Sequence, residues 1–204
     1  GETAAVARGA SFDGSVIVGT SQVGGGTQAF RWTAGTGMVA LENPDKPAGS
    51  PFTPRSWAVD VSDDGRFIAG NAGLAAYTAA RWVDGKLESL GNLPGLYPGY
   101  VGASTAHGIS GNGLVVVGEA DDGDIAGWHA FRWAEGNGMQ TVEDWLEDSG
   151  ATIDGNVTRV ARAANCDGSV VVGESRSGDL FIARGAGTGT GDASGNPSGG
   201  GGGG

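Results

Sequence analysis

The segment AVDVSDDGRFIAG, residues 58–70, decides the fold, because close relatives of it recur at three other places in the chain. The shared pattern is an alanine, a Ser or Asn four positions later, an Asp-Gly or Asn-Gly pair, and a further glycine five positions on. Such a pair between β-forming residues is a strong hairpin signal, since both residues tolerate positive φ. The pairs end at Gly14, Gly65, Gly113 and Gly168, which are 51, 48 and 55 residues apart. This interval predicts one repeated structural unit.

Each unit continues with two more predicted strands. The third contains an arginine, in AFRW at 29–32, AARW at 79–82 and WHAFRW at 128–133, and the fourth follows a glycine-containing turn. Four-stranded antiparallel units of this length predict an all-β fold, a β-propeller-like array of about four repeats. The last is predicted to be incomplete, because no fourth strand follows DLFIARG at 179–185. The predicted repeats span residues 5–43, 56–93, 104–146 and 159–185.

The sequence also predicts how the units pack against one another. Unbroken apolar runs such as Val115–Val117 are typical of strands covered on both faces, as in stacked sheets. Arginine recurs at one position of the third strand, where a guanidinium can stack on an aromatic ring and bond to the next repeat. We therefore predict a structural role for the repeated arginines and tryptophans, which are Arg31, Arg81, Arg132, Trp32, Trp82 and Trp133. Ala80 replaces the phenylalanine of other repeats, which is expected to weaken packing there.

Two segments differ from the strands. Thr141 to Asp144 matches a capping box, so a short helix is predicted at 142–148, with Trp145 packed inward. Residues 186–204 are rich in Gly, Ser and Thr, which predicts a flexible linker after a single repeat domain at 1–185.

Charge and composition exclude several classes of function. The net charge of −11 opposes binding to nucleic acid. Neither a long apolar run nor a basic amphipathic helix is present, so direct membrane insertion is not expected. The single Cys166 excludes an internal disulfide and offers no zinc spacing. The N-terminal residues have no signal-peptide pattern, and we expect any such peptide to have been removed already.

The combination of motifs resembles a known family. His129-Ala130-Phe131 followed by Arg-Trp, the SxDG turns with their VVVG-type strands, and EDWLEDSGATIDG at 143–155 resemble the bacterial HAF extracellular repeats. These repeats also occur in passenger regions of autotransporters, especially of alphaproteobacteria. The resemblance covers about residues 5–185 and implies an extracellular or outer-membrane surface protein of propeller-like fold, without an assigned activity.

Catalytic and metal signals are few. No GxSxG motif occurs, and the two histidines, His107 and His129, have no matched carboxylate motif. The SxDG turns are shorter than the SxDxGxTW Asp boxes of sialidase-like propellers, and no paired carboxylates repeat. We expect no cofactor and no enzyme activity. Calcium stays open as an alternative at Asp121, Asp122 and Asp124, although their spacing differs from a DxDxDG loop.

Binding is the favoured hypothesis, because long loops on a rigid scaffold carry function. The aromatic candidates for stacking on a sugar or anchoring a protein partner are Trp57, Tyr97, Tyr100 and Trp128. The alternative is that the same residues cap the core at the ends of the repeats. We therefore expect a surface module that binds a glycan or a cell-surface protein. The alternatives are a structural domain that self-associates through an open repeat edge and, less favoured, a carbohydrate-active enzyme.

Overall fold

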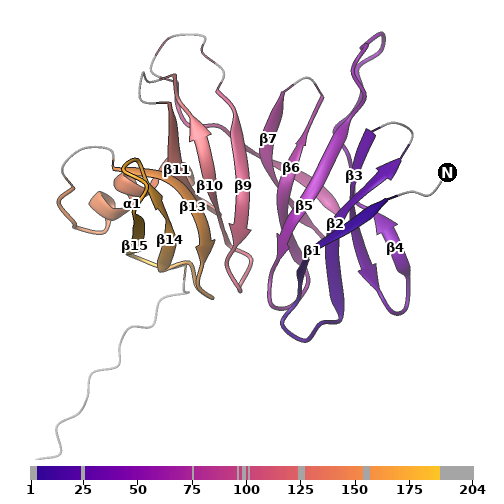
Figure 1. The fold of residues 1–204 in the computed structure, drawn as a ribbon, viewed down its shortest axis with the longest axis horizontal. Coiled ribbons are helices and arrows are strands. Elements are labelled where there is room, and N and C mark those ends of the chain that lie inside the picture. The colour runs from indigo at the N-terminus through magenta and orange to yellow at the C-terminus, as the bar shows by residue number, and fades with distance from the viewer. Residues whose placement is uncertain are drawn as a thin grey trace, which may run out of the picture.

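The computed structural model describes residues 4–23, 26–74, 76–95, 97, 100, 102–123, 127–153 and 157–188 of the chain. Within these residues lie four antiparallel sheets and one helix (Figure 1). The sheets follow one another across the molecule in chain order. This confirms the all-β class and the four-unit array, while the predicted linker at 186–204 lies almost wholly outside the described residues.

Strands pair with their chain neighbours in every sheet, so each sheet is a simple meander. The first sheet contains β1 (Ala5–Ala10), β2 (Val16–Val23), β3 (Gly26–Thr33) and β4 (Gly37–Ala40). The second contains β5 (Arg55–Val61), β6 (Phe67–Gly73), β7 (Tyr77–Val83) and β8 (Lys86–Gly91).

The third sheet contains β9 (Ser104–Ile109), β10 (Val115–Asp121), β11 (Trp128–Ala134) and β12 (Gly138–Thr141). The fourth has three strands among the described residues: β13 (Thr158–Ala164), β14 (Val170–Ser175) and β15 (Leu180–Arg184). Up to Thr188, the end of the described chain, the last repeat is therefore incomplete, as predicted. The helix α1 (Val142–Asp148) joins the third sheet to the fourth and begins with the predicted capping box between Thr141 and Asp144.

The SxDG turns owe their sequence to side-chain hydrogen bonds. In the second sheet the Ser62 hydroxyl donates to Asp64 Oδ1 at 2.6 Å and accepts from the Phe67 N–H at 3.0 Å. Asp64 Oδ1 also accepts from the Arg66 N–H at 3.0 Å, and Gly65 takes a φ of 72°. The other three turns repeat the arrangement, with Asn112 or Asn165 supplying an amide oxygen at one position.

Backbone hydrogen bonds link these turns from sheet to sheet. In each bond, an N–H group of one turn donates to a carbonyl oxygen of the turn in the next sheet. The three bonds run from Phe12 to Asp63, from Asp63 to Gly111 and from Asn112 to Cys166, at 2.8 to 3.1 Å. The turns therefore form a continuous row along one end of the array.

Close packing between sheets explains the turn glycines beyond their positive φ. A Cβ on Gly113 would lie within 3 Å of the Phe67 ring of the preceding sheet, and Gly65 and Gly168 are covered in the same way. Gly14 has the same backbone conformation, yet a Cβ there would meet nothing within 4 Å. Among the described residues no sheet lies before the first one, so its turn glycine is uncovered.

Three hydrophobic clusters fill the spaces between consecutive sheets. They include Val18 and Trp82 between the first two sheets, Phe131 between the second and third, and Val117 with Trp145 between the third and fourth. Each sheet thus buries its apolar faces against its neighbours rather than within itself.

The expectation that Ala80 weakens the second repeat is corrected by the position of Trp82. In the other sheets a phenylalanine ring lies over the glycine opposite it: Phe30 over Gly19, Phe131 over Gly118, and Phe181 over Gly173. In the second sheet the Trp82 ring lies over Gly70 instead. The larger indole fills the place that the missing phenylalanine leaves, and Trp82 is fully buried.

The array has one uncovered sheet face at each end. Ala58, Ala106 and Ala161 are fully buried beneath the preceding sheet, whereas Ala7, at the same position of β1, is exposed. On the last sheet, Leu180 is 86% exposed and Ile182 is 62% exposed. The residues that match Leu180 in the earlier sheets are Ala29, Ala79 and Ala130, all fully buried.

Replacing turn glycines by alanine separates conformational strain from inter-sheet packing. Gly14→Ala should lower the free energy of unfolding by about 1 kcal/mol, the cost of a left-handed non-glycine residue. Gly113→Ala carries the same strain and also overpacks against Phe67, which should cost about 2 kcal/mol more. Urea unfolding measures both. Equal losses for the two variants would contradict the packing described above.

Acid should weaken the turns. Hydrogen bonds from the Ser15 N–H and the Ser11 hydroxyl lower the pKa of Asp13 to about 2, and like bonds lower the pKa values of Asp64 and Asp167. Because these folded-state pKa values lie below the unfolded values, the stabilisation is complete above about pH 4 and is lost as the pH falls toward about 2.

The matched control for acid is the triple variant Asp13→Asn, Asp64→Asn and Asp167→Asn, since Asn112 shows that an amide fits this turn. Its unfolding free energy should fall less than that of the wild-type chain between pH 5 and pH 2, both measured by urea titration. The buried Asp60, whose pKa is raised mainly by burial, is present in both proteins and cancels in the comparison. Parallel pH profiles would refute the assignment.

Candidate functional site

Three of the four predicted binding aromatics gather at one end of the third sheet, opposite the row of SxDG turns. Tyr97 is 63% exposed, and Tyr100 and Trp128 are partly exposed. The Tyr100 N–H donates to Tyr97 O at 3.1 Å. The Tyr100 hydroxyl donates to Asp121, which faces Trp128 across strands β10 and β11. We call Tyr97, Tyr100 and Trp128 the aromatic end.

The fourth aromatic candidate has a different environment. Trp57 is half-buried on β5 of the second sheet and packs edge-to-face on Tyr77, with ring centroids 4.7 Å apart. The Tyr77 hydroxyl accepts a hydrogen bond of 3.5 Å from Arg55. Its described contacts therefore put Trp57 in a packing role beside Tyr77, on the sheet that precedes β9.

Asp121 holds Tyr100 in position. Its carboxylate accepts from the Tyr100 hydroxyl and from the Gly123 N–H, and these bonds lower the pKa of Asp121. The same hydroxyl bond is the main reason that the pKa of Tyr100 is raised. The phenol therefore stays protonated and oriented, with one side of the ring against Gly123.

The acidic residues considered for calcium have protein partners. Asp121 binds Tyr100, and Asp122 Oδ1 lies 3.3 Å from His129 Nε2. Asp124 lies outside the described residues. Within the described part of the chain, no group of three or more His, Cys, Asp or Glu side chains is placed to hold a metal ion.

Both histidines have carboxylate partners that the sequence did not reveal. His129 is fully buried, and its Nδ1 lies 3.0 Å from Arg176 Nη2 of the fourth sheet. His107 Nε2 lies 3.3 Å from Glu119, and this hydrogen bond is the main cause of the lowered pKa of Glu119. The two carboxylates come from the end of β10, so only strand pairing could have matched them to the histidines.

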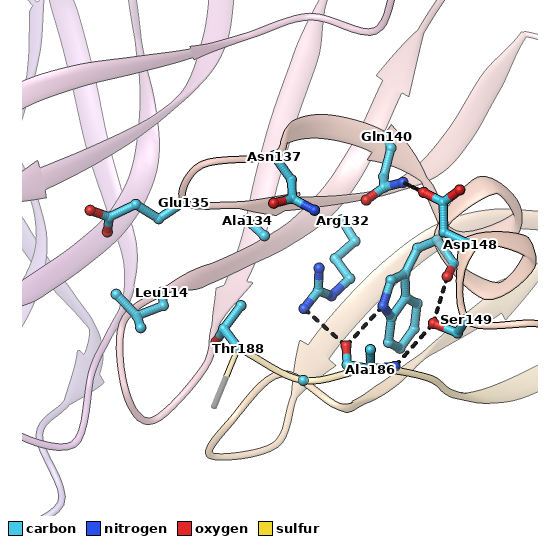
Figure 2. Close-up of a pocket in the computed structure, with 12 residues that line it drawn as sticks. Leu114, Arg132, Ala134, Glu135, Asn137, Gln140, Asp148, Ser149, Ala186 and Thr188 are labelled. Carbon is cyan, nitrogen blue, oxygen red and sulfur yellow. Dashed lines mark hydrogen bonds between the residues drawn. The ribbon is translucent and has the colours of Figure 1, made fainter. Parts of the chain in front are cut away.

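At the end of the array that carries the SxDG turns, an arginine lies in each groove between adjacent sheets. Figure 2 shows the groove of the third and fourth sheets, which has a volume of about 580 Å³. Arg132 donates to Gly168 O at 3.2 Å and to Ala186 O at 3.5 Å, and it stacks on the Trp145 ring at 4.7 Å. Trp145 itself donates to Ala186 O at 3.0 Å.

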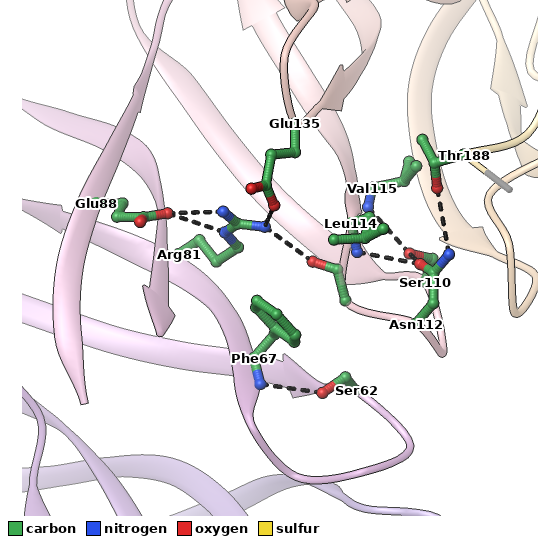
Figure 3. A network of polar contacts seen from close by, with 11 residues as sticks. Ser62, Phe67, Arg81, Glu88, Ser110, Asn112, Leu114, Val115, Glu135 and Thr188 are labelled. Atoms are coloured by element: carbon green, nitrogen blue, oxygen red, sulfur yellow. Dashed lines mark hydrogen bonds and ion pairs between the residues drawn. The ribbon is translucent and has the colours of Figure 1, made fainter. Parts of the chain in front are cut away.

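The groove between the second and third sheets contains a complete ion-pair network (Figure 3). Arg81 lies 2.8 Å from Glu88 of its own sheet and 3.1 Å from Glu135 of the next. It also donates to Gly113 O at 3.1 Å and stacks over the rings of Phe67 and Trp133. Arg81 thus joins two sheets by charge, hydrogen bonds and ring contacts together.

The groove between the first and second sheets is open. Arg31 is half-buried there and lines a cavity of about 640 Å³ with Asp64, Arg66 and Asp84. Within the described part of the chain, its guanidinium makes no hydrogen bond or ion pair, because Asp84 binds Arg66 and Asp64 binds Ser62. The three equivalent arginines therefore differ in their partners.

The repeated tryptophans differ likewise. The Trp82 indole donates to Glu42 O of the preceding sheet at 2.8 Å, while Trp32 and Trp133 are only half-buried. A preceding sheet covers Trp82 and none covers Trp32.

Comparison with known proteins establishes the fold and no family. No family model matches the chain, and no curated protein matches it. Among solved structures, TolB from Acinetobacter baumannii aligns with 14% identity and a TM-score of 0.50 over 86% of this chain. A protein assigned as TolB from Agrobacterium tumefaciens aligns with 13% identity and a TM-score of 0.50 over 87% of this chain.

The fold is that of a β-propeller-like array. The aligned region covers 39% of the Acinetobacter protein and 56% of the Agrobacterium protein, so this chain corresponds to part of either. At these identities the likeness concerns the fold alone. None of the described helices has the length and apolar character needed to cross a membrane.

Proposed function

We propose that this chain is a non-catalytic binding module of a bacterial cell surface, and that its aromatic end binds a glycan. The observation that carries the proposal is the exposure of Tyr97, Tyr100 and Trp128 at one end of a single sheet. Aromatic rings that keep a polar group hydrogen-bonded offer stacking faces at little conformational cost.

The local chemistry supports a sugar as the ligand. The Asp121 carboxylate lies beside Tyr100 and is partly exposed, so its remaining lone pairs can accept hydrogen bonds from sugar hydroxyls. Binding would need no movement of the sheets, because Tyr100 is already held by Asp121. The cell-surface location is supported by the resemblance of the motifs to HAF extracellular repeats.

A glycan array probed with the chain tests this function. Specific binding is expected, and Tyr97→Ala with Tyr100→Ala should weaken it by about tenfold or more, as expected for loss of stacking and hot-spot contacts. The control is Phe12→Ala, which removes an exposed aromatic ring from the opposite end of the array. Binding that survives loss of both tyrosines would contradict the proposed site.

As a second candidate function, we propose head-to-tail self-association through the uncovered faces. In this contact, the first sheet of one copy packs on the exposed face of the last sheet of another copy. Ala7 would then lie against a preceding sheet, as Ala58, Ala106 and Ala161 do inside the array. Three internal interfaces of this kind already exist in the chain, so the proposed contact continues an established one.

The exposed residues favour this contact. Val172, Leu180 and Ile182 form an apolar face, with Arg162 and Glu174 paired at 3.1 Å beside it. In this contact a small alanine, Ala7, faces the neighbouring sheet, as an alanine does at each internal interface. Because the two contacting faces differ, the association is heterologous and builds chains of copies rather than closed pairs.

Sedimentation velocity over a range of concentrations tests self-association. The wild-type chain should form concentration-dependent oligomers, whereas Leu180→Glu and, separately, Ala7→Arg should sediment as monomers. Phe52→Glu, which changes an exposed apolar residue elsewhere, should behave like the wild type. A wild-type chain that is monomeric at every concentration would rule the contact out.

A further inference from the structure

The starting observation is a difference between two equivalent buried arginines. Arg81 and Arg132 occupy the same strand position, opposite Ala69 and Val117 respectively, and each is only 3% exposed. A buried guanidinium is stable when counter-charges and hydrogen bonds replace its lost hydration. Arg81 has these in full, from the carboxylates of Glu88 and Glu135.

Both carboxylates are missing from the surroundings of Arg132. The residue opposite Arg81 on the fourth strand is Glu88, whereas the residue opposite Arg132 is Gln140. The Glu135 N–H donates to Leu114 O, and the equivalent bond in the last sheet runs from the Gly185 N–H to Ser169 O. Gly185 therefore occupies the position in the last sheet that Glu135 occupies in the third, and it has no side chain to supply a carboxylate.

The remaining contacts leave part of the guanidinium available. Arg132 donates through Nε to Gly168 O and through Nη2 to Ala186 O, and Trp145 covers one face. Within the described residues, Nη1 donates no hydrogen bond, and no carboxylate lies within ion-pair distance of Arg132. Burial is the main cause of the lowered pKa of this arginine, and the negative charge of Asp167 opposes that shift.

The groove beside Arg132 has room for a ligand. It has a volume of about 580 Å³, and Leu114 and Ala134 give it an apolar wall, while Asn137 offers an amide without a hydrogen-bond partner among the described residues (Figure 2). Two acidic residues also line it, but Glu135 is bound to Arg81 and Asp148 accepts from Gln140 at 3.0 Å. The charge of Glu135 is thus partly balanced by Arg81, while Asp148 has a neutral partner.

We infer that this groove is a binding site for a sugar acid, whose carboxylate accepts from Nη1 of Arg132, the nitrogen through which Arg81 binds Glu135. A cationic N–H group binds a carboxylate more strongly than a neutral acceptor. The apolar wall suits a sugar ring, and the Asn137 amide suits a hydroxyl. The site lies at the opposite end of the array from the aromatic end and does not depend on the function proposed for it.

Nuclear magnetic resonance provides a local test. The Trp145 indole N–H, which bonds to Ala186 O beside Arg132, reports on this groove separately from Tyr97 and Tyr100. Titration with D-glucuronate should shift its signal saturably. D-glucose, which has no carboxylate, should cause no saturable shift. A parallel titration with acetate tests whether the sugar ring is needed. If acetate causes no saturable shift, the ring is required. If acetate shifts the signal as strongly as glucuronate, the site recognises only the carboxylate.

A matched pair of variants tests the role of the missing counter-charge without removing Arg132. Gln140→Glu supplies a carboxylate at the strand position that Glu88 has beside Arg81, so its negative charge should offset that of Arg132 and weaken glucuronate binding by about tenfold or more. Gln140→Ala removes the same bond to Asp148 without adding charge, and its affinity should stay within about twofold of the wild type.

The outcomes are decisive in either direction. A saturable glucuronate shift that Gln140→Glu abolishes and Gln140→Ala preserves supports the site. The inference is overturned by the absence of a Trp145 shift with glucuronate, by an equal shift with glucose, by acetate matching glucuronate, or by unchanged binding in Gln140→Glu. Unchanged glycan-array binding in Gln140→Glu shows that the two ends act separately.

Discussion

Face-to-face packing between neighbouring sheets is the constraint on which the rest of this structure depends. A four-stranded sheet with apolar residues on both faces cannot bury them alone, so each sheet needs a neighbour on each side. Small residues make the close approach feasible. Alanines such as Ala58, Ala106 and Ala161 lie against the preceding sheet, and the turn glycines leave room for its Val or Phe side chains. At the end face of the last sheet, which no described sheet covers, apolar residues such as Leu180 and Ile182 are exposed.

Polar contacts between sheets fix their relative positions. The Ser56 hydroxyl accepts from the Ala29 N–H at 3.0 Å, and Ser104 accepts from the Ala79 N–H at 2.9 Å. Between the second and third sheets, the buried Asn71 side chain donates to Ala106 O and accepts from its N–H. Because an unpaired buried amide is costly, these bonds favour one register between the sheets over its alternatives. The buried Glu143 extends the same principle to the helix, since it accepts from the backbone of Val157 and Thr158.

Variation among the repeats, rather than their shared pattern, distinguishes places where a ligand or partner can bind. Arg31, Arg81 and Arg132 share one position, but their neighbours differ: Arg81 pairs with two carboxylates, and among the described residues the other two have none within ion-pair distance. The same strand position therefore has different partners in different repeats. The aromatic end likewise belongs to one repeat, because Tyr97 and Tyr100 precede β9 and Trp128 is the first residue of β11.

The sequence by itself determined the number of units, the position of each hairpin turn and the short helix. These features follow from local chemistry, since Asp-Gly pairs, β-forming runs and a capping box act over a few residues. It also indicated Tyr97, Tyr100 and Trp128 as exposed candidates. Only the tertiary structure decided which residues share an environment. Trp57 packs on Tyr77, Trp82 fills the place of a missing phenylalanine, and His129 is buried beside Arg176 of the next sheet. Each of these depends on strand register or on a neighbouring sheet about 50 residues away, a relation that no local pattern encodes.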